Sequence, residues 1–221
     1  MRVVLFGATG MVGSAALLEC LEEPDVTEVL SIGRRSCAVE HDKLSELVHE
    51  DLFDYASVTD RLSGFDACFF CLGVSSVGMS EEEYTRITHD LTVAVAEALL
   101  EASPSLTFCF ISGAGADSSE KGRVMWARVK GKIENRLLAM PFKHAWVFRP
   151  AVIQPMKGIR SRSTATNAFY AVIGPLRPFL PRLVPSLVTT TETIGKAMIR
   201  AAQDGAPVPI LESREINQLV Q

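Results

Sequence analysis

The sequence lacks long hydrophobic runs and an excess of positive charge. No uninterrupted apolar stretch reaches the roughly 20 residues that a helix needs to cross a bilayer, so we expect no membrane span. The net charge of −4 provides no positive field to attract phosphates, which argues against nonspecific nucleic-acid binding. The chain has 221 residues, of which 48% are hydrophobic and 22% are charged. This length and composition are typical of one globular domain.

The sequence also lacks a disulfide framework and a metal-ligand pattern. Its five cysteines are not spaced as in small secreted proteins. Cys68 and Cys71 spell C-x-x-C, but DACFFCLG predicts a buried strand, on which residues three apart point to opposite faces. Reduced, buried cysteines are therefore the better interpretation, and metal or redox chemistry the weaker one. The four histidines show no metal spacing, so we predict no metal site.

The first residues, MRVVLFGATGMVGSAALL, combine an arginine, an apolar run and small residues, as a signal peptide does. Their three glycines fit a strand, a turn and a helix better than a cleaved leader. We therefore expect a cytoplasmic protein.

Short apolar runs alternate with segments of helical period through most of the chain. Strands are predicted at Val3–Phe6, Val26–Ile32, Glu46–His49, Ala67–Leu72, Leu106–Ser112 and Ala145–Ile153. Helices are predicted at residues 14–23, Glu81–Ala102 and Ser119–Ala139. Strands that alternate with helices imply the α/β class, with a Rossmann-type doubly wound parallel sheet covered on both faces.

The composition changes after Ile153. Residues 154–188 mix prolines and arginines with apolar patches, and the prolines exclude a long continuous helix. We interpret this region as a small substrate-side cap; a membrane-surface patch or a partner-binding surface is the alternative. A capped helix at residues 189–203 and a last strand at 208–213 complete a single domain, 1–221.

The motif G-A-T-G-M-V-G follows the first predicted strand and opens a helix. Glycines here allow a tight turn and the close approach of a pyrophosphate, whose charge the helix N-terminus favours. A glycine-rich turn that merely packs a helix on a sheet is the alternative. We predict that this motif binds a dinucleotide through Gly7, Thr9, Gly10, Met11, Val12 and Gly13.

The second predicted strand ends in S-I-G-R-R, where an acidic residue would favour NAD. Arg34 and Arg35 stand there instead, and a guanidinium can pair with a 2′-phosphate in bidentate fashion. The sequence therefore favours NADP over NAD, against the alternative of two solvated loop arginines.

Two further strand ends supply candidate cofactor contacts. Asp51 and Leu52 follow the third strand, where the carboxylate could lie by the adenine amino group or simply cap a turn. Cys71, Leu72 and Gly73 end the fourth strand and would bring the backbone close to the adenosine ribose.

With these motifs assembled, the chain resembles the atypical, extended branch of the short-chain dehydrogenase/reductase superfamily, and most of all its Tat-interactive-protein-like NAD(P)-binding oxidoreductases. The resemblance rests on the order and spacing of GATGMVG, GRR, CLG, FRPAVI and ISGAGADSSEKGRVMWARVKGKIENRLL. It covers nearly the whole chain and is weakest at residues 154–188.

The resemblance implies roles for residues near the reacting end of the cofactor. Ser112 would orient a substrate carbonyl, and Lys130 would bind the nicotinamide ribose and lower the pKa of a catalytic tyrosine. Arg149 and Pro150 would lie near the nicotinamide. The tyrosine itself falls on Trp126, where the sequence departs from the family pattern.

Tryptophan changes what the site can do. An indole N–H donates a hydrogen bond but has no accessible ionisation, so Trp126 could orient a carbonyl without delivering a proton. Two functions follow: an NADP(H)-binding, weak or specialised oxidoreductase for a small carbonyl substrate, or a non-catalytic dinucleotide-binding regulatory or interaction protein. An isomerase or dehydratase of the same superfamily is a weaker third. The sequence leaves open a homodimer or another protein partner.

Overall fold

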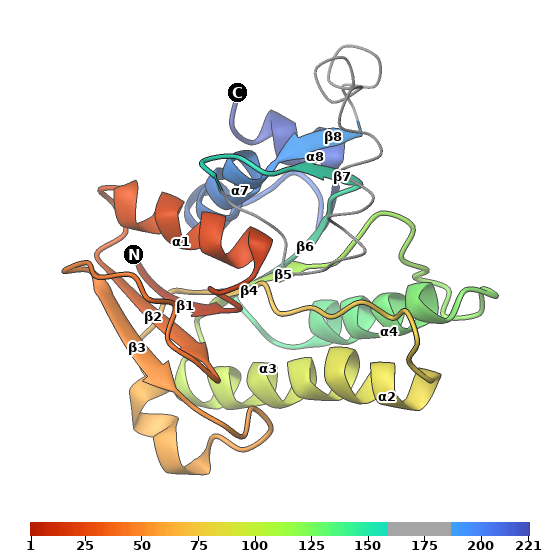
Figure 1. Cartoon of the computed structure of the whole chain (residues 1–221), viewed down its shortest axis with the longest axis horizontal. Helices are drawn as coiled ribbons and strands as arrows, with labels where there is room; N and C mark the ends of the chain where they lie inside the picture. The colour runs from red at the N-terminus through yellow and green to blue at the C-terminus, as the bar shows by residue number, and fades with distance from the viewer. Residues whose placement is uncertain (159–186) are drawn as a thin grey trace.

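A computed structural model describes residues 1–158 and 187–221 of the chain. Within these residues the central sheet has seven strands, all parallel, in the order β3-β2-β1-β4-β5-β6-β9 (Figure 1). The strand order reverses between β1 and β4, so the predicted doubly wound Rossmann-type sheet is confirmed. The strands are β1 Arg2–Phe6, β2 Glu28–Gly33, β3 Leu44–Val48, β4 Ala67–Phe70, β5 Thr107–Ile111, β6 His144–Arg149 and β9 Ile210–Glu212.

Helices cover both faces of this sheet. α1 (Met11–Glu22) and α7 (Thr191–Asp204) pack on one face, and α3 (Leu91–Ala102) and α4 (Met125–Ala139) pack on the other (Figure 1). The shorter helices are the 3₁₀ turn η1 (Ala56–Leu62), α2 (Glu81–Thr85), the π turn η2 (Arg86–Asp90) and α8 (Ser213–Gln218). Two short strands, β7 (Val152–Gln154) and β8 (Val188–Thr190), pair in parallel outside the main sheet.

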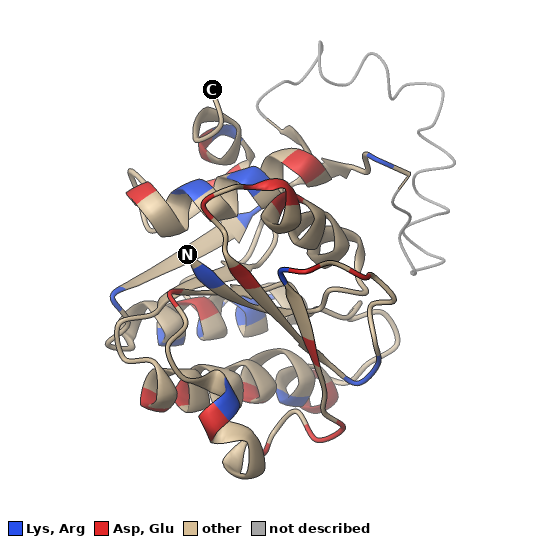
Figure 2. Ribbon diagram, turned by 90° about the vertical axis from the view of Figure 1, so that its left-hand side faces the viewer, with Lys and Arg blue, Asp and Glu red and all other residues tan. Residues whose placement is uncertain are grey.

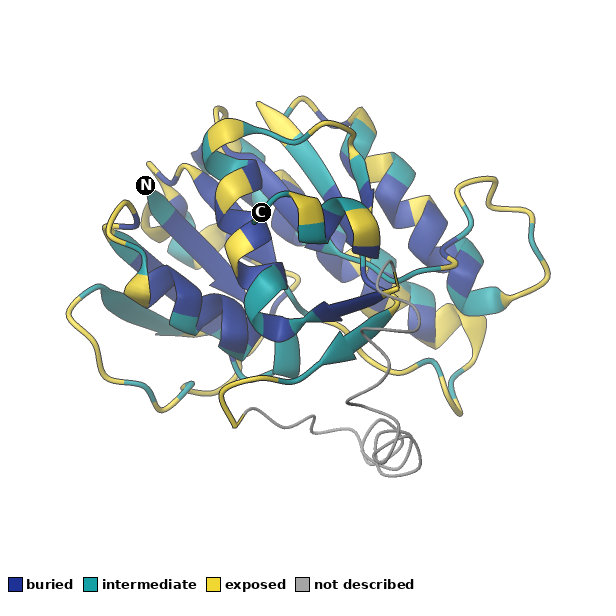
Figure 3. Ribbon diagram, turned by 90° about the horizontal axis from the view of Figure 1, so that it is seen from above, coloured by how far each residue is buried: buried dark blue, intermediate teal, exposed yellow. Residues whose placement is uncertain are grey.

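The central strands are buried between two core clusters, one on each face of the sheet. Seen from above, Figure 3 shows dark blue strands beneath the helices of one face. Alternation along each strand divides the core in two. Val4 and Phe6 belong to the cluster under α3 and α4, whereas Val3 and Leu5 belong to the cluster under α1 and α7. Charged residues of both signs are interspersed over helices and loops (Figure 2).

Cys68 and Cys71 pack against opposite core clusters, as the strand periodicity predicts. Burial raises the pKa of both thiols, and all five cysteines are free. No group of three potential metal ligands occurs in the described part of the chain, and no helix there is long and apolar enough to cross a membrane.

Three predicted elements differ from the structure. The predicted strand Ala145–Ile153 is divided at Pro150, which has no N–H for the sheet, into β6 and β7. The predicted helix Ser119–Ala139 begins only at Met125, because Asp117 accepts the backbone N–H groups of Ser119 and Gly122 and holds that segment as a loop.

The predicted helix Glu81–Ala102 is interrupted by η2, and the sequence analysis missed η1 and α8. Most of the predicted cap, residues 154–188, lies outside the described residues. Its two ends form β7 and β8, so the chain leaves and re-enters the described fold at neighbouring points.

Candidate cofactor and active site

The glycine turn connects β1 directly to α1. Gly7 adopts φ +85°, which L-residues rarely reach, and its carbonyl accepts the N–H of Gly10 at 2.8 Å. Helix α1 then starts at Met11, after Gly10, and no side chain caps it. Its first N–H groups are therefore open to an anionic ligand at the carboxyl edge of the sheet.

The glycines are also required by packing. A Cβ atom on Gly13 would lie 2.1 Å from the carbonyl oxygen of Gly7, and one on Gly7 would lie 2.7 Å from the carbonyl carbon of Cys71. The turn after β1 therefore packs against the end of β4 and the start of α1 with no room for side chains. This cradle fits the pyrophosphate of a dinucleotide, which needs close backbone approach and a helix N-terminus.

A cavity of about 310 Å³ lies beside this turn, lined by Gly7, Thr9, Ser31, Gly33, Arg34, Arg35, Leu52 and Leu72, with Ala8 and Ile32. Arg34 and Arg35 follow β2 and are exposed. Neither guanidinium has an ion-pair partner among the described residues. Both cations are thus free to pair with an anion at this rim of the cavity.

A second cavity of about 480 Å³ continues from the first and shares Arg34, Leu52 and Leu72 with it. Asp51 and Gly73 line it too. The Asp51 carboxylate accepts the N–H of Phe53 at 2.9 Å, so this side chain does cap a turn while it faces the cavity. Together the two cavities bring the predicted contacts after β1, β2, β3 and β4 to one edge of the sheet.

The remaining predicted site residues gather around α4 and the ends of β5 and β6. Trp126, Lys130 and Glu134 are spaced four residues apart along α4 and therefore share one face of the helix. Gly131 allows this face to approach the loop after β5, since a Cβ atom there would lie 1.8 Å from the carbonyl oxygen of Asp117.

Lys130 is buried, with 9% of its surface exposed. Its Nζ donates to the carbonyl oxygen of Ile111 at 3.2 Å and lies 4.8 Å from the ring centroid of Phe110. Burial lowers the pKa of Lys130 to about 8, and the negative charge of Glu134 raises it by a smaller amount. The ammonium is therefore held at the end of β5, next to Ser112.

Ser112 does not stand free at the strand end. Its hydroxyl donates a short hydrogen bond to Glu134, which is fully buried. The same carboxylate pairs with Arg149, whose Nε lies 3.1 Å from both carboxylate oxygens and whose Nη2 makes a further short contact. Arg149 also donates to Ser118 at 2.7 Å.

Glu134 therefore connects two residues that the sequence placed in the site, yet the sequence analysis missed it. An ionised carboxylate only accepts hydrogen bonds, so the Ser112 hydrogen points to Glu134 and not to a ligand. The sequence held one signal that Glu134 is buried. It is an acidic residue between Ile133 and Leu137 on the apolar face of α4, four residues after Lys130.

Trp126 is half-buried near the start of α4. Its Cη2 lies 3.5 Å from the Cβ position of Gly115, so the indole packs over the loop that follows β5. The carbonyl oxygen of Pro150, a buried residue, accepts the N–H of Ala114 at 3.1 Å. This hydrogen bond connects the loop after β5 to the end of β6.

Comparisons with known proteins agree with this arrangement. Residues 3–214 match the model of the NAD dependent epimerase/dehydratase family. The chain belongs to this family. The predicted resemblance to short-chain dehydrogenases/reductases is thereby confirmed, and the class of cofactor, NAD(P), is that of the family.

Individual proteins resemble the chain over most of its length. Protein fmp52, mitochondrial, from Emericella nidulans is 30% identical over 207 residues, covering 90% of this chain and 86% of the relative. Protein HTATIP2 from Rattus norvegicus is 29% identical and covers 68% of this chain and 62% of its own. A Burkholderia thailandensis oxidoreductase of the short chain dehydrogenase/reductase family superposes with a TM-score of 0.72 at 16% identity, covering 98% of this chain and 92% of that one.

These relatives correct one expectation. The sequence analysis predicted a cytoplasmic protein, but several of the fungal relatives are named as mitochondrial proteins. The prediction was wrong because it rested on the glycine-rich first residues fitting a strand and a turn better than a signal peptide, and that observation does not distinguish the cytoplasm from mitochondria.

Proposed function

We propose that this protein binds NADP(H) at the carboxyl edge of its sheet and catalyses carbonyl reduction slowly or not at all. The glycine turn and the N-terminus of α1 would hold the pyrophosphate, and Arg34 and Arg35 would pair with the 2′-phosphate. Leu52, Leu72 and Gly73 would lie against the adenosine. As in the mitochondrial relatives, we place the protein in mitochondria.

The observation that carries the choice of NADP is the pair of exposed guanidiniums, free of partners within the described chain, at the rim of the 310 Å³ cavity. A carboxylate at this position would accept the ribose hydroxyls of NAD and repel a phosphate. Two cations favour the phosphate instead.

Calorimetric titration with NADPH and NADH tests this assignment. Replacing both arginines (R34A/R35A) removes two charge-assisted hydrogen-bonding groups, so we expect NADPH to bind about 100-fold more weakly and NADH to change by less than about threefold. R61A/R214A is the matched control, since it removes two exposed arginines away from both cavities. Equal losses for the two nucleotides would refute the NADP assignment.

Slow or absent turnover is supported by one contact and by one residue type at the α4 end. The Ser112 hydrogen is committed to Glu134, and Trp126 carries no transferable proton. A bound NADPH supplies hydride, but reduction of a carbonyl also needs an acid, and loss of a general acid typically costs 10²–10⁴-fold. Lys130 would still bind ribose hydroxyls.

A second candidate is a specialised reductase in which Lys130 provides the proton. Its buried ammonium, with a pKa lowered to about 8, is a better acid than an exposed lysine. This candidate predicts that K130M loses NADPH-dependent carbonyl reduction while it retains NADPH affinity to within about tenfold. If K130M keeps both its rate of carbonyl reduction and its NADPH affinity, the Lys130 ammonium is not the acid.

A further inference from the structure

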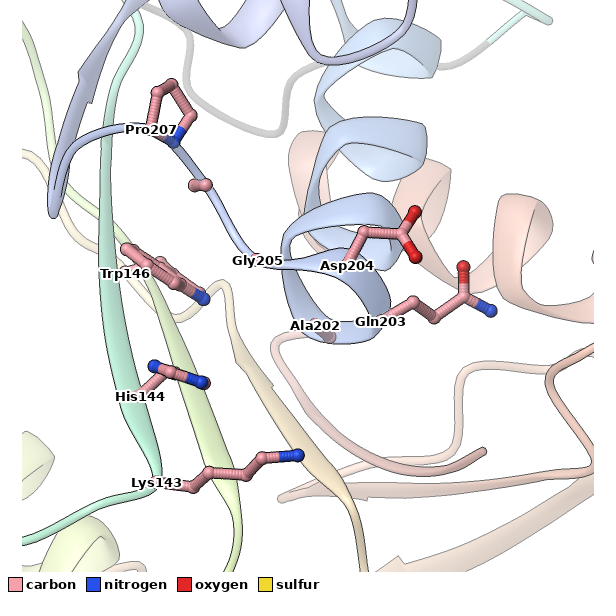
Figure 4. A pocket seen from close by; sticks show the side chains of 9 residues that line it. Lys143, His144, Trp146, Ala202, Gln203, Asp204, Gly205 and Pro207 are labelled. Carbon is pink, nitrogen blue, oxygen red and sulfur yellow. The ribbon is translucent and has the colours of Figure 1, made fainter.

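A polar cavity of about 430 Å³ lies away from the cofactor site, at the amino end of β6 (Figure 4). It is lined mainly by Lys143, His144, Trp146, Gln203, Asp204 and Gly205. The glycine turn lies at the carboxyl edge of the same parallel sheet, so the two sites are on opposite edges. A volume in this range is typical of a pocket for a small molecule.

The cavity exists because α7 ends before it covers the whole of β6. His144, Trp146 and Phe148 alternate along the strand and face the side of the sheet that α7 covers. Phe148 is fully buried, Trp146 is half-buried and His144 is exposed. Burial thus falls towards the amino end of the strand, where α7 has stopped at Asp204.

One wall of the cavity offers hydrogen-bond donors. Figure 4 shows nitrogen atoms of Lys143, His144 and Trp146 directed towards the end of α7. The Lys143 ammonium has no partner within the described residues, and His144 stacks on Trp146 with ring centroids 5.3 Å apart and an interplanar angle of 17°. These groups suit an anionic oxygen.

Trp146 adds a donor that lacks an acceptor. Its Nε1 is buried and has no hydrogen-bond partner among the described residues. Gly205 lies beside the indole, since a Cβ atom there would be 3.9 Å from Cζ2. A buried donor without an acceptor is costly, and this indole is the one buried group of the wall whose hydrogen-bonding capacity is unused within the described residues.

The opposite wall offers acceptors. The 14-residue helix α7 ends here, and its last carbonyl groups carry the negative end of the helix dipole. Asp204 also lines the cavity, but its largely exposed carboxylate lies 3.6 Å from Arg200 and points away from Lys143, His144 and Trp146 in Figure 4. This wall suits an ammonium group, whereas the small side chains of Ala202 and Ala206 and the ring of Pro207 add apolar surface.

We propose that this cavity binds a free α-amino acid. Its carboxylate would face Lys143, His144 and Trp146, and its ammonium would face the end of α7. A simple anion would satisfy only the first wall, and a simple cation only the second. The zwitterion matches both walls, and a small apolar side chain matches the remaining surface.

The two tryptophans of the chain make a direct test possible. W126F leaves Trp146 as the only tryptophan, so its fluorescence reports on the cavity alone. We expect a saturable change on titration with one or more amino acids with small apolar side chains, such as L-alanine or L-valine. The N-acetyl derivative and the amide of the same amino acid, which each lack one charge, should bind at least tenfold more weakly.

Variants in the W126F background locate the site. K143A should weaken amino-acid binding about tenfold or more, whereas K132A, which removes an exposed lysine of α4, should leave it unchanged. NADPH affinity should be the same in both variants. If no amino acid gives a saturable change at millimolar concentrations, the proposal is wrong. Equal binding of the N-acetyl derivative would instead identify a simple anion site and also overturn it.

Discussion

The glycine-turn end and the α4 end of the site are built in the same way but use their polar groups differently. In each, a helical glycine packs against a backbone carbonyl of a preceding loop: Gly13 on Gly7, and Gly131 on Asp117. At the glycine-turn end the helix N-terminus and both arginines remain available. At the α4 end, Ser112, Glu134 and Arg149 satisfy one another.

This difference separates binding from catalysis. Polar groups that lack protein partners at the surface of a cavity can pair with a ligand, whereas a mutually satisfied network stabilises the fold. The comparison therefore supports the proposed function, in which the glycine-turn end binds the cofactor and the α4 end lacks an acid for catalysis.

The largest expected effect tests whether the α4 network is structural. E134A leaves Arg149, whose side chain is 11% exposed, without its main partner, and should lower the free energy of unfolding by about 3–5 kcal/mol. Urea denaturation measures the loss. The control E97A removes an exposed partner of Arg136 and should cost less than about 1 kcal/mol. Equal losses would mean that the buried network does not stabilise the α4 end.

A second prediction uses the buried ammonium of Lys130. Its folded-state pKa is lowered from 10.5 to about 8, so the unfolded chain binds more protons between these values. Lys130 therefore opposes folding below pH 8, and this penalty is relieved as the pH rises towards 10.5. The span of the effect is on the order of 3 kcal/mol.

We expect wild-type stability, measured relative to K130M by urea denaturation, to rise across that pH window. The exposed Lys132 provides the control K132M, for which the difference from wild type should stay flat. A flat difference for K130M as well would show that Lys130 titrates normally and is not held in a buried position.

A smaller effect tests the glycine-turn end. G13A places a methyl group 2.1 Å from a backbone oxygen and should cost about 2 kcal/mol of stability, together with NADPH affinity, because α1 must shift. G73A is a matched control for stability, since nothing lies within 4 Å of its Cβ position. If both variants unfold at the same urea concentration, the close packing of the turn is not required.

Much of the fold followed from the sequence because its central strands are buried. Runs such as Val3–Phe6 and Ala67–Leu72 are continuously apolar, and the helices between them have clear periodicity. Element ends were harder to predict. Because Asp117 accepts backbone N–H groups, α4 begins later in the sequence than predicted. Hydrophobic periodicity does not predict a local contact of this kind.

The sequence also predicted that the glycine turn and the residues after β2 lie together, because their placement depends on local backbone geometry and strand position. That they bind a cofactor stays a prediction. The network around Glu134 was missed, because it joins residues from β5, α4 and β6 that are far apart in sequence. A strand-end serine looks the same whether its hydroxyl faces a substrate or a buried carboxylate.

The central claim is that the reaction end lacks the tyrosine acid of the family pattern, and single-turnover oxidation of NADPH over a panel of aldehydes and quinones tests it directly. We expect wild type to react slowly or not at all, and W126Y to gain about 100-fold, because Lys130 can lower the pKa of the new phenol. W126F should show no gain. Rapid turnover by the wild type that W126Y leaves unchanged would contradict the account.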